Sequence, residues 1–287
     1  MRYIFLTDIH IDCLGHEKLN DFLSACADPS IDGYLISGDI GTAPNVANFL
    51  RIMQDAWQKP ILFCLGNHDF WYGSIQATST NVRVLARESE LDWPDLTYIS
   101  SQSFVPLTPE TALVGHDGWY DGLHGDPRGS NFLMNDWWNI KEFRDVLEPA
   151  ATCFYRGGPR LDMRSRMKVI ELCQKLASKA ATHVKFGIQA AVNNGYTSVI
   201  VLTHVPPWEQ AHVHEGRPGG DYASPWFTSK VMGDMLEEVA VQNPDVEFTV
   251  LCGHTHGRID VQILGNLICR VGGADYINPE IQFLVDV

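Results

Sequence analysis

Short apolar runs that end in polar corners recur along this chain and constrain its fold more than any other feature. Six runs lead directly into a corner with Asp, Asn or His, at residues 2–7, 31–37, 60–65, 111–116, 197–203 and 248–251. Two further runs, at 266–271 and 281–287, lack the polar corner. Runs of this length bounded by turn residues are typical of buried β-strands.

Helical patterns separate some of these runs. Residues 45–58 form one such pattern, with Pro44 near its start. A longer amphipathic helix is predicted over 161–192, because Asn193, Asn194 and Gly195 form a stop signal after it. Strands that alternate with helices predict an α/β fold, in which ligands gather at the carboxyl ends of strands.

Residues from about 117 to 195 interrupt the strand pattern. Their first part is rich in Gly, Asp and Trp, and the long helix follows it. Segments this long between strands of a compact domain are usually functional or mobile. We therefore expect one domain over 1–287 with a helical cap inserted at about 117–195.

Composition limits the partners of the chain. Its 287 residues are 45% hydrophobic and carry a formal net charge of -14, which argues against binding to long nucleic acids or anionic membranes. The apolar run at the N-terminus is too short for a signal peptide, and no run approaches the ~20 residues of a membrane span. The seven cysteines form no Cys-x-x-Cys pair, so we expect reduced thiols and a cytoplasmic protein.

The polar corners contain a set of potential metal ligands. Two histidines two residues apart, His254 and His256, lie between Gly253 and Gly257 directly after an apolar run. The other corners add carboxylate, imidazole and amide groups at Asp8, His10, Asp39, Asn67, His68, Asp69 and His204. This mixture suits manganese, iron, zinc or nickel better than calcium, and it lacks the thiolates of a structural zinc site.

The order of these corners resembles the calcineurin-like metallophosphoesterase family. The blocks Asp-x-His, Gly-Asp, Gly-Asn-His-Asp, His and Gly-His-x-His follow one another from residue 8 to residue 257. The resemblance implies a four-layer α/β sandwich, with two mixed sheets face to face and helices outside. It also implies a hydrolase of phosphate esters.

The resemblance assigns two divalent metal ions, of which manganese is favoured, to seven residues. It implies that Asp8, His10 and His256 hold the first ion, that Asn67, His204 and His254 hold the second, and that Asp39 bridges them. Paired metals of this kind lie ~3.5–4 Å apart, and a hydroxide between them is the expected nucleophile. With two carboxylates the site would be formally positive, so the metals would attract a phosphate to an acidic protein.

The same resemblance gives two further residues catalytic roles. His68 would face the substrate, stabilise the phosphoryl oxygens and protonate the leaving group. Asp69 would hydrogen-bond the His68 ring and fix its tautomer. The alternative for Asp69 is a helix N-cap after the turn.

Several positions depart from particular branches of the family. Phosphoprotein phosphatases carry Asp-Arg-Gly after the second block and Glu at the end of the third, whereas this chain has neither and has Asp69. Purple acid phosphatases have a tyrosine ligand where this chain has Thr42. These departures favour a small phosphodiester or nucleotide as substrate. A phosphomonoesterase or protein phosphatase is the alternative, and a catalytically silent metal-binding scaffold is the third reading.

Other residues are weaker candidates for substrate contacts. His116 ends an apolar run, and Arg156 and Arg217 lie in Gly- and Pro-rich loops where they would grip phosphate. The alternative for His116 is a packed core imidazole, and the alternative for the two arginines is a solvated loop position.

His212 and His214 are interpreted as loop residues. The tryptophans and tyrosines of the insertion are expected to pack it onto the core. The substrate would be small and phosphorylated, and the oligomeric state is left open.

Overall fold

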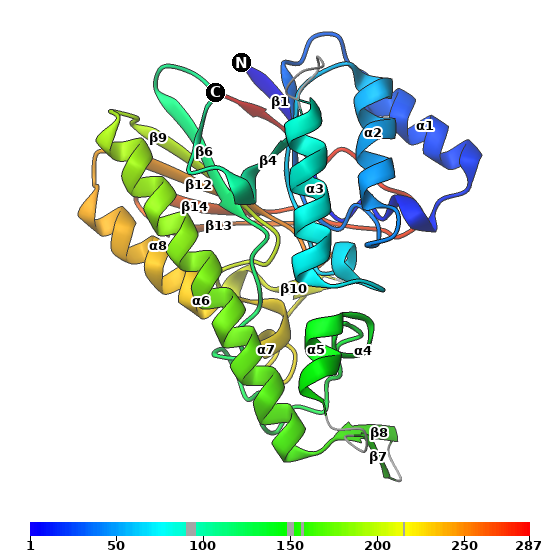
Figure 1. Ribbon diagram of the computed structural model, residues 1–287. Coiled ribbons are helices and arrows are strands. Elements are labelled where there is room, and N and C mark those ends of the chain that lie inside the picture. The colour runs from blue at the N-terminus through cyan, green and yellow to red at the C-terminus, as the bar shows by residue number, and fades with distance from the viewer. Residues whose placement is uncertain (90–95, 148–151, 156–157, 215) are drawn as a thin grey trace.

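The computed structural model describes residues 1–89, 96–147, 152–155, 158–214 and 216–287. Two large β-sheets lie face to face in it (Figure 1). The first sheet has five strands in the order β15-β1-β2-β3-β4. These strands are Phe283–Asp286, Arg2–Leu6, Gly33–Ser37, Ile61–Cys64 and Leu96–Tyr98.

The second sheet has six strands in the order β13-β14-β12-β9-β6-β5. They comprise Ile259–Leu264, Leu267–Val271, Glu247–Cys252, Ser198–Thr203, Thr111–His116 and Val105–Pro106. In each sheet the central strands are parallel and the edge pairs β15–β1, β13–β14 and β5–β6 are antiparallel. The prediction of two mixed sheets is confirmed.

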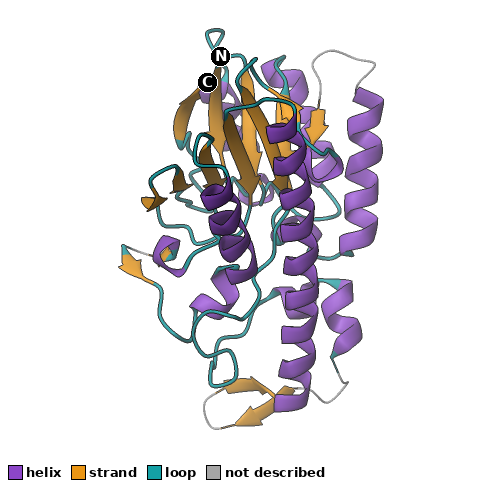
Figure 2. Cartoon of the chain, turned by 90° about the vertical axis from the view of Figure 1, so that its left-hand side faces the viewer, coloured by secondary structure: helices purple, strands orange, loops and turns teal. Residues whose placement is uncertain are grey.

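Helices cover the outer face of each sheet, which completes four layers (Figures 1 and 2). The first sheet carries α1 (His16–Cys26), α2 (Val46–Trp57) and α3 (Ile75–Ser89), and the second carries α6 (Met163–Asn193) and α8 (Lys230–Gln242). Helix α2 buries Val46, Leu50, Met53 and Trp57, which recur at helical spacing on one face. Between the sheets lies an apolar layer that includes Phe5, Leu35, Leu113, Leu202 and Leu251.

The segment from residue 117 to α6 lies below the sheets in Figure 1. It contains α4 (Asp136–Asn139), α5 (Lys141–Val146) and a hairpin of β7 (Thr152–Tyr155) and β8 (Gly158–Leu161). The long helix was predicted over 161–192, and α6 begins two residues later because the Asp162 side chain accepts a hydrogen bond from the Ser165 backbone N–H and caps it. The division into a core and a cap stays a prediction.

Short elements complete the chain. The described 3₁₀ turns are η1 (Ile11–Cys13), η2 (His68–Phe70), η3 (Ile99–Ser101) and η4 (Glu209–Ala211). A short helix, α7, spans Ser224–Phe227, and β10 (Val213–His214) pairs with β11 (Arg217–Pro218) in a small hairpin. Among the helices that the structure describes, none has the length and apolarity needed to cross a membrane. The six cysteines whose side chains are described are free thiols.

Candidate metal centre

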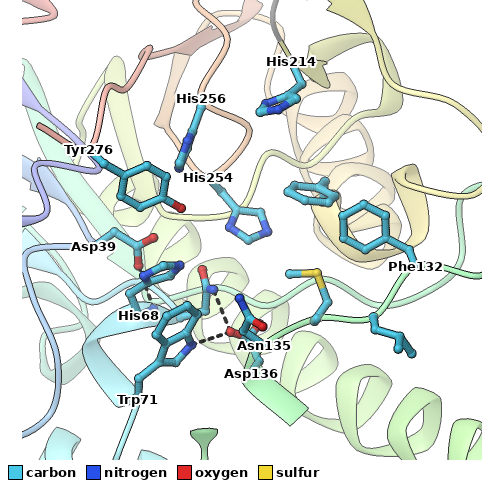
Figure 3. Close-up of a pocket in the computed structure, with 14 residues that line it drawn as sticks. Asp39, His68, Trp71, Phe132, Asn135, Asp136, His214, His254, His256 and Tyr276 are labelled. Atoms are coloured by element: carbon cyan, nitrogen blue, oxygen red, sulfur yellow. Dashed lines mark hydrogen bonds between the residues drawn. The ribbon is translucent and has the colours of Figure 1, made fainter. Parts of the chain in front are cut away.

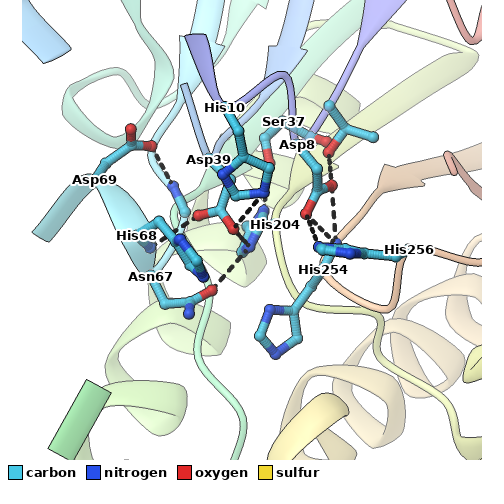
Figure 4. A network of polar contacts seen from close by, with 12 residues as sticks. Asp8, His10, Ser37, Asp39, Asn67, His68, Asp69, His204, His254 and His256 are labelled. Atoms are coloured by element: carbon cyan, nitrogen blue, oxygen red, sulfur yellow. Dashed lines mark hydrogen bonds and ion pairs between the residues drawn. The ribbon is translucent and has the colours of Figure 1, made fainter. Parts of the chain in front are cut away.

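The polar corners of both sheets meet at one place. Asp8 follows β1, Asp39 follows β2 and Asn67 follows β3, while His204 and His254 follow β9 and β12 of the other sheet (Figure 4). Strands β1, β2 and β3 run parallel to one another, as do β9 and β12, so the carboxyl ends of each set share an edge of its sheet. The structure thus brings together all seven residues that were predicted to bind metal.

The backbone at these corners is held in an uncommon conformation. Asp8, His10, Asp39, His254 and His256 all have positive φ, between 39° and 68°. Few residues other than glycine adopt this region, at a cost of about 1–3 kcal/mol each, and such residues cluster at functional sites. Five strained positions among seven candidate ligands indicate that the fold maintains this corner for a purpose other than stability.

Two glycines of the sequence motifs make room for the carboxylates. A Cβ on Gly66 would lie 2.1 Å from Oδ1 of Asp39, and a Cβ on Gly253 would lie 2.0 Å from Oδ2 of Asp8. Both distances are far below van der Waals contact, so a side chain at either position would displace the carboxylate. The glycines in Gly-Asn-His-Asp and Gly-His-x-His therefore serve the carboxylates of the neighbouring blocks.

The first group of ligands comprises Asp8, His10 and His256. Each offers one ligand atom, and these atoms all lie within 4.8 Å of one another. Oδ1 of Asp8 is 3.4 Å from Nε2 of His256. The Asp8 carboxylate is fixed by hydrogen bonds from the Thr7 hydroxyl at 2.6 Å and from the His254 backbone N–H at 3.0 and 3.1 Å.

The second group comprises Asp39, His204 and His254, which meet the same distance limit. Nε2 of His204 lies 3.4 Å from Oδ2 of Asp39 and 3.0 Å from Oδ1 of Asn67. Nδ1 of His204 is 2.8 Å from the Ser37 carbonyl, so Nδ1 carries a proton and Nε2 is the nitrogen that faces the cluster. Asp39 also lies 3.9 Å from Nε2 of His10, between the two groups.

A residue that the sequence analysis missed orients Asn67. Asp136, at the start of α4, accepts hydrogen bonds from Nδ2 of Asn67 at 2.9 Å, from Nε1 of Trp71 at 2.6 Å and from the Tyr120 hydroxyl at 2.9 Å. Because Nδ2 is directed at Asp136, the amide oxygen of Asn67 points toward His204. The insertion therefore contributes to the cluster through a carboxylate 69 residues away in sequence.

The electrostatics of the cluster fit a cation. Asp8 and Asp39 are each 1% exposed, and no Lys or Arg of the described chain pairs with either. Burial alone would lower the pKa of His204, but the Asp39 and Asp8 carboxylates outweigh it and raise that pKa to about 10. Nε2 of His10 is buried without a hydrogen-bond partner. Divalent metal ions would supply the missing positive charge, displace the proton and bind the orphaned nitrogen.

His68 lies beside the cluster and faces the pocket (Figures 3 and 4). Its ring stacks on Trp71 at 3.6 Å and meets the edge of His10 at 4.7 Å. Burial lowers the pKa of His68 to about 4, so the ring is neutral and carries one N–H. His10, Asp39 and His68 also offer ligand atoms that lie within 4.8 Å of one another, so His68 is a further candidate metal ligand.

Asp69 does not make the hydrogen bond to the His68 ring that was expected of it. Its carboxylate accepts backbone N–H bonds from Ile40 at 3.0 Å, Gly41 at 2.8 Å and Gly66 at 2.9 Å. Asp69 thus joins the loop after β2 to the loop after β3. It holds Asp39 and Asn67 in register and makes no hydrogen bond to the His68 ring, so we replace the catalytic assignment of Asp69 with a positioning role.

A pocket of about 250 Å³ opens onto the cluster (Figure 3). Asp39, Asn67, His68, His254 and His256 line one side of it. Tyr276, from the loop after β14, lies 4.4 Å from the His10 ring and 5.0 Å from the His256 ring. No motif indicated Tyr276 or Trp71, because aromatic residues in loops carry no spacing signal.

Neither His116 nor Arg217, two of the three residues predicted to bind substrate, lines this pocket. His116 lines a different cavity, together with His183. Arg217 is exposed in β11 and is not among the residues that line the pocket. Arg156 lies outside the described residues. His214, which was interpreted as a loop residue, lines the pocket, and its Nδ1 is 3.1 Å from the Thr255 carbonyl.

Replacing Asp136 with asparagine is expected to weaken one metal ion and spare the other. The substitution removes the negative charge and one of the two acceptor oxygens that serve the Asn67, Trp71 and Tyr120 donors, so the Asn67 amide is held less firmly. Loss of such an outer partner typically costs about 10–100-fold in metal affinity. Calorimetric titration with Mn²⁺ measures the affinity for each ion.

Asp121→Asn is the matched control, because Asp121 is equally buried but accepts only backbone N–H bonds from Leu123 and Val231. Equal weakening of both ions would contradict the assignment of Asn67 to one of them.

Comparison with known proteins agrees with this geometry. The model of the family described as calcineurin-like phosphoesterase matches residues 1–258. Among curated proteins, none matches the chain in sequence. The fold is similar to that of the phosphopantetheinyl hydrolase from Mycobacterium tuberculosis, with 14% identity, a TM-score of 0.58, and coverage of 94% of this chain and 89% of that one.

A dimetal phosphatase from Danio rerio is also similar in fold. Its identity is 11% and its TM-score 0.54, and the match covers 95% of this chain and 87% of that one. Identities this low show a shared fold, and a shared fold does not fix a substrate.

Proposed function

We propose that this chain, which belongs to the calcineurin-like phosphoesterase family, hydrolyses a small phosphodiester that carries an apolar or aromatic group. Membership of the family implies metal-dependent hydrolysis of phosphoesters. The observation that supports a functional site in this chain is the convergence of seven potential ligands, from both sheets, on one buried cluster.

We assign Asp8, His10 and His256 to one metal ion, Asn67, His204 and His254 to a second, and Asp39 to both. The two groups of ligand atoms within 4.8 Å of one another support this division. Asp39 lies between His10 and His204, which is the position that a bridging carboxylate requires. Manganese is the proposed ion, since oxygen and imidazole ligands without thiolates suit it.

The metals would neutralise the charge on the phosphoryl oxygens. They would also lower the pKa of a bound water, which could then attack phosphorus as hydroxide. His68 is placed to act on the substrate from the pocket side. Its neutral ring donates one N–H to a phosphoryl oxygen or to the leaving oxygen as charge develops there. Trp71 stacks on this ring and limits its movement, which keeps the donor aimed at the reacting group.

The walls of the pocket indicate what kind of ester fits. Beside the polar cluster, the pocket is lined by the apolar and aromatic side chains of Phe132, Leu133, Met134, Phe227, Trp71 and Tyr276. Among the described residues that line the pocket, none is Lys or Arg. A second phosphate on the substrate would therefore find no cationic partner beyond the metals, whereas an apolar or aromatic group would be buried.

Hydrolysis of three model compounds by manganese-loaded protein tests this proposal. Bis(p-nitrophenyl) phosphate should be cleaved faster than p-nitrophenyl phosphate, and inorganic pyrophosphate slowest. Burial of a second ring against the apolar wall contributes about 1–2 kcal/mol, which is roughly tenfold in kcat/KM. Faster cleavage of the monoester would replace the phosphodiesterase with a phosphatase. Cleavage of none, with both metals bound, would favour a metal-binding scaffold.

We also propose that the enzyme acts in the cytoplasm. The support is the set of free cysteines, which stay reduced there.

A further inference from the structure

A second cavity of about 660 Å³ is lined largely by residues of α3 and α6. It is larger than the pocket at the metal cluster and shares no lining residue with it. Asp117 lies in its wall and accepts hydrogen bonds from the Leu65 N–H, the Ser100 hydroxyl and the Tyr98 hydroxyl at 2.6–2.8 Å. The cavity is therefore separate from the proposed active site.

The two helices present polar faces to this cavity. From α6 come Lys175, Lys179 and His183, which are spaced one turn apart along a single face. From α3 come Gln76, Ser79, Thr80 and Arg83, which also recur at helical spacing. Two lysines one turn apart repel each other and weaken a helix slightly unless an anion lies between them.

The cationic side chains of the cavity have no acidic partners. Within the described chain, Arg83, Lys175 and Lys179 form no ion pair. Two acidic residues line the cavity, and both are engaged elsewhere. Asp117 holds the three donors described above, and Glu142 accepts the backbone N–H groups of Ile75 and Gln76 at the start of α3. Three cationic and two anionic side chains thus line the cavity, which leaves an excess of one positive charge, and among the described residues neither carboxylate pairs with a lysine or arginine there.

His116 adds a neutral donor at the base of the cavity. Its Nδ1 accepts a hydrogen bond from the Gly118 backbone N–H at 3.2 Å. Burial lowers the pKa of His116 to about 4, so the ring is neutral and its single proton sits on Nε2. Within the described chain, Nε2 has no hydrogen-bond partner, although the ring lines the cavity.

We propose that this cavity is a second binding site, for a small phosphorylated molecule. A phosphoryl group carries enough charge and enough acceptor oxygens for one guanidinium, two ammonium groups and the His116 N–H. The volume falls within the usual range for small-molecule sites and exceeds what a bare phosphate fills. Trp119, Leu172 and Leu176 line the remaining wall, so the ligand also carries an organic part.

Calorimetric titration of the metal-loaded protein with phenylphosphonate tests the site. This probe joins a phosphoryl group to an aromatic ring and has no ester bond to cleave. The wild type should show two binding events, one at the metal centre and one in the cavity. The double variant Lys175→Met/Lys179→Met should lose the second event, with an affinity at least about 100-fold lower, since each lysine contributes roughly tenfold.

The double variant Lys185→Met/Lys230→Met is the matched control. It removes two positive charges from helices α6 and α8 at positions that pair with Glu238 and Asp234 outside the cavity. It should titrate as the wild type does. Crystals soaked in tungstate locate the anion independently, with anomalous density expected beside Lys175 and Lys179. Density at the metal centre alone, or a cavity variant that titrates like the wild type, would overturn the proposal.

Discussion

Asp39→Asn is expected to release both metal ions together and to abolish hydrolysis. Asp39 is the carboxylate that lies between the two groups of ligands, 3.4 Å from Nε2 of His204 and 3.9 Å from Nε2 of His10. The substitution replaces one ligand oxygen with an NH2 group and removes the shared negative charge that would offset the repulsion between the ions. Outer partners of a metal are worth about 10–100-fold in affinity, so a shared ligand should exceed that for each ion.

Metal content after dialysis against limiting Mn²⁺ measures this effect. The wild type should hold two ions per chain and Asp39→Asn close to none. Asp8→Asn is the informative control, because Asp8 belongs to one group and should cost mainly one ion. If Asp39→Asn keeps one ion at wild-type affinity, Asp39 is not a bridge.

His68→Ala is expected to keep both metal ions yet to lose about 10²–10⁴-fold in kcat, the usual contribution of a positioned proton donor. The ring lines the pocket and, being neutral, offers one N–H as a hydrogen-bond donor to a phosphoryl or leaving oxygen. Esters with more basic leaving groups should lose the most, because their oxygen depends most on the donor.

The control for this variant is His124→Ala. His124 is a half-buried histidine that contacts the Thr228 hydroxyl at 2.9 Å and lines neither cavity. It should retain the wild-type rate and metal content. Loss of one metal ion in His68→Ala would instead assign His68 to the ligands, as its proximity to His10 and Asp39 allows.

The apolar runs allowed most of the sheet to be predicted because its strands are buried on both faces. All five residues of β2, for example, are buried, so the strand appears in the sequence as a continuous apolar run. Helix α3 was not predicted individually. Its Thr78-Ser79-Thr80-Asn81 segment favours helix poorly, and packing of Val82 and Leu85 determines its structure instead.

The ligands could be predicted because each directly follows a strand, and the carboxyl ends of parallel strands meet. Asp136 and Tyr276 could not be predicted. Asp136 reaches Asn67 from the insertion, and Tyr276 reaches His10 from a loop beyond the last motif. Both positions depend on tertiary packing that leaves no periodic pattern. The role of Asp69 was misjudged because adjacency in sequence to His68 does not decide which backbone donors its carboxylate meets.

The most direct test of the account is a titration of metal-free protein with Mn²⁺, followed by hydrolysis of bis(p-nitrophenyl) phosphate. We predict no cleavage without metal and a rate that rises until two ions are bound per chain. A rate that survives removal of metal, or that reaches its plateau at one ion per chain, would contradict the two-metal phosphoesterase proposed here.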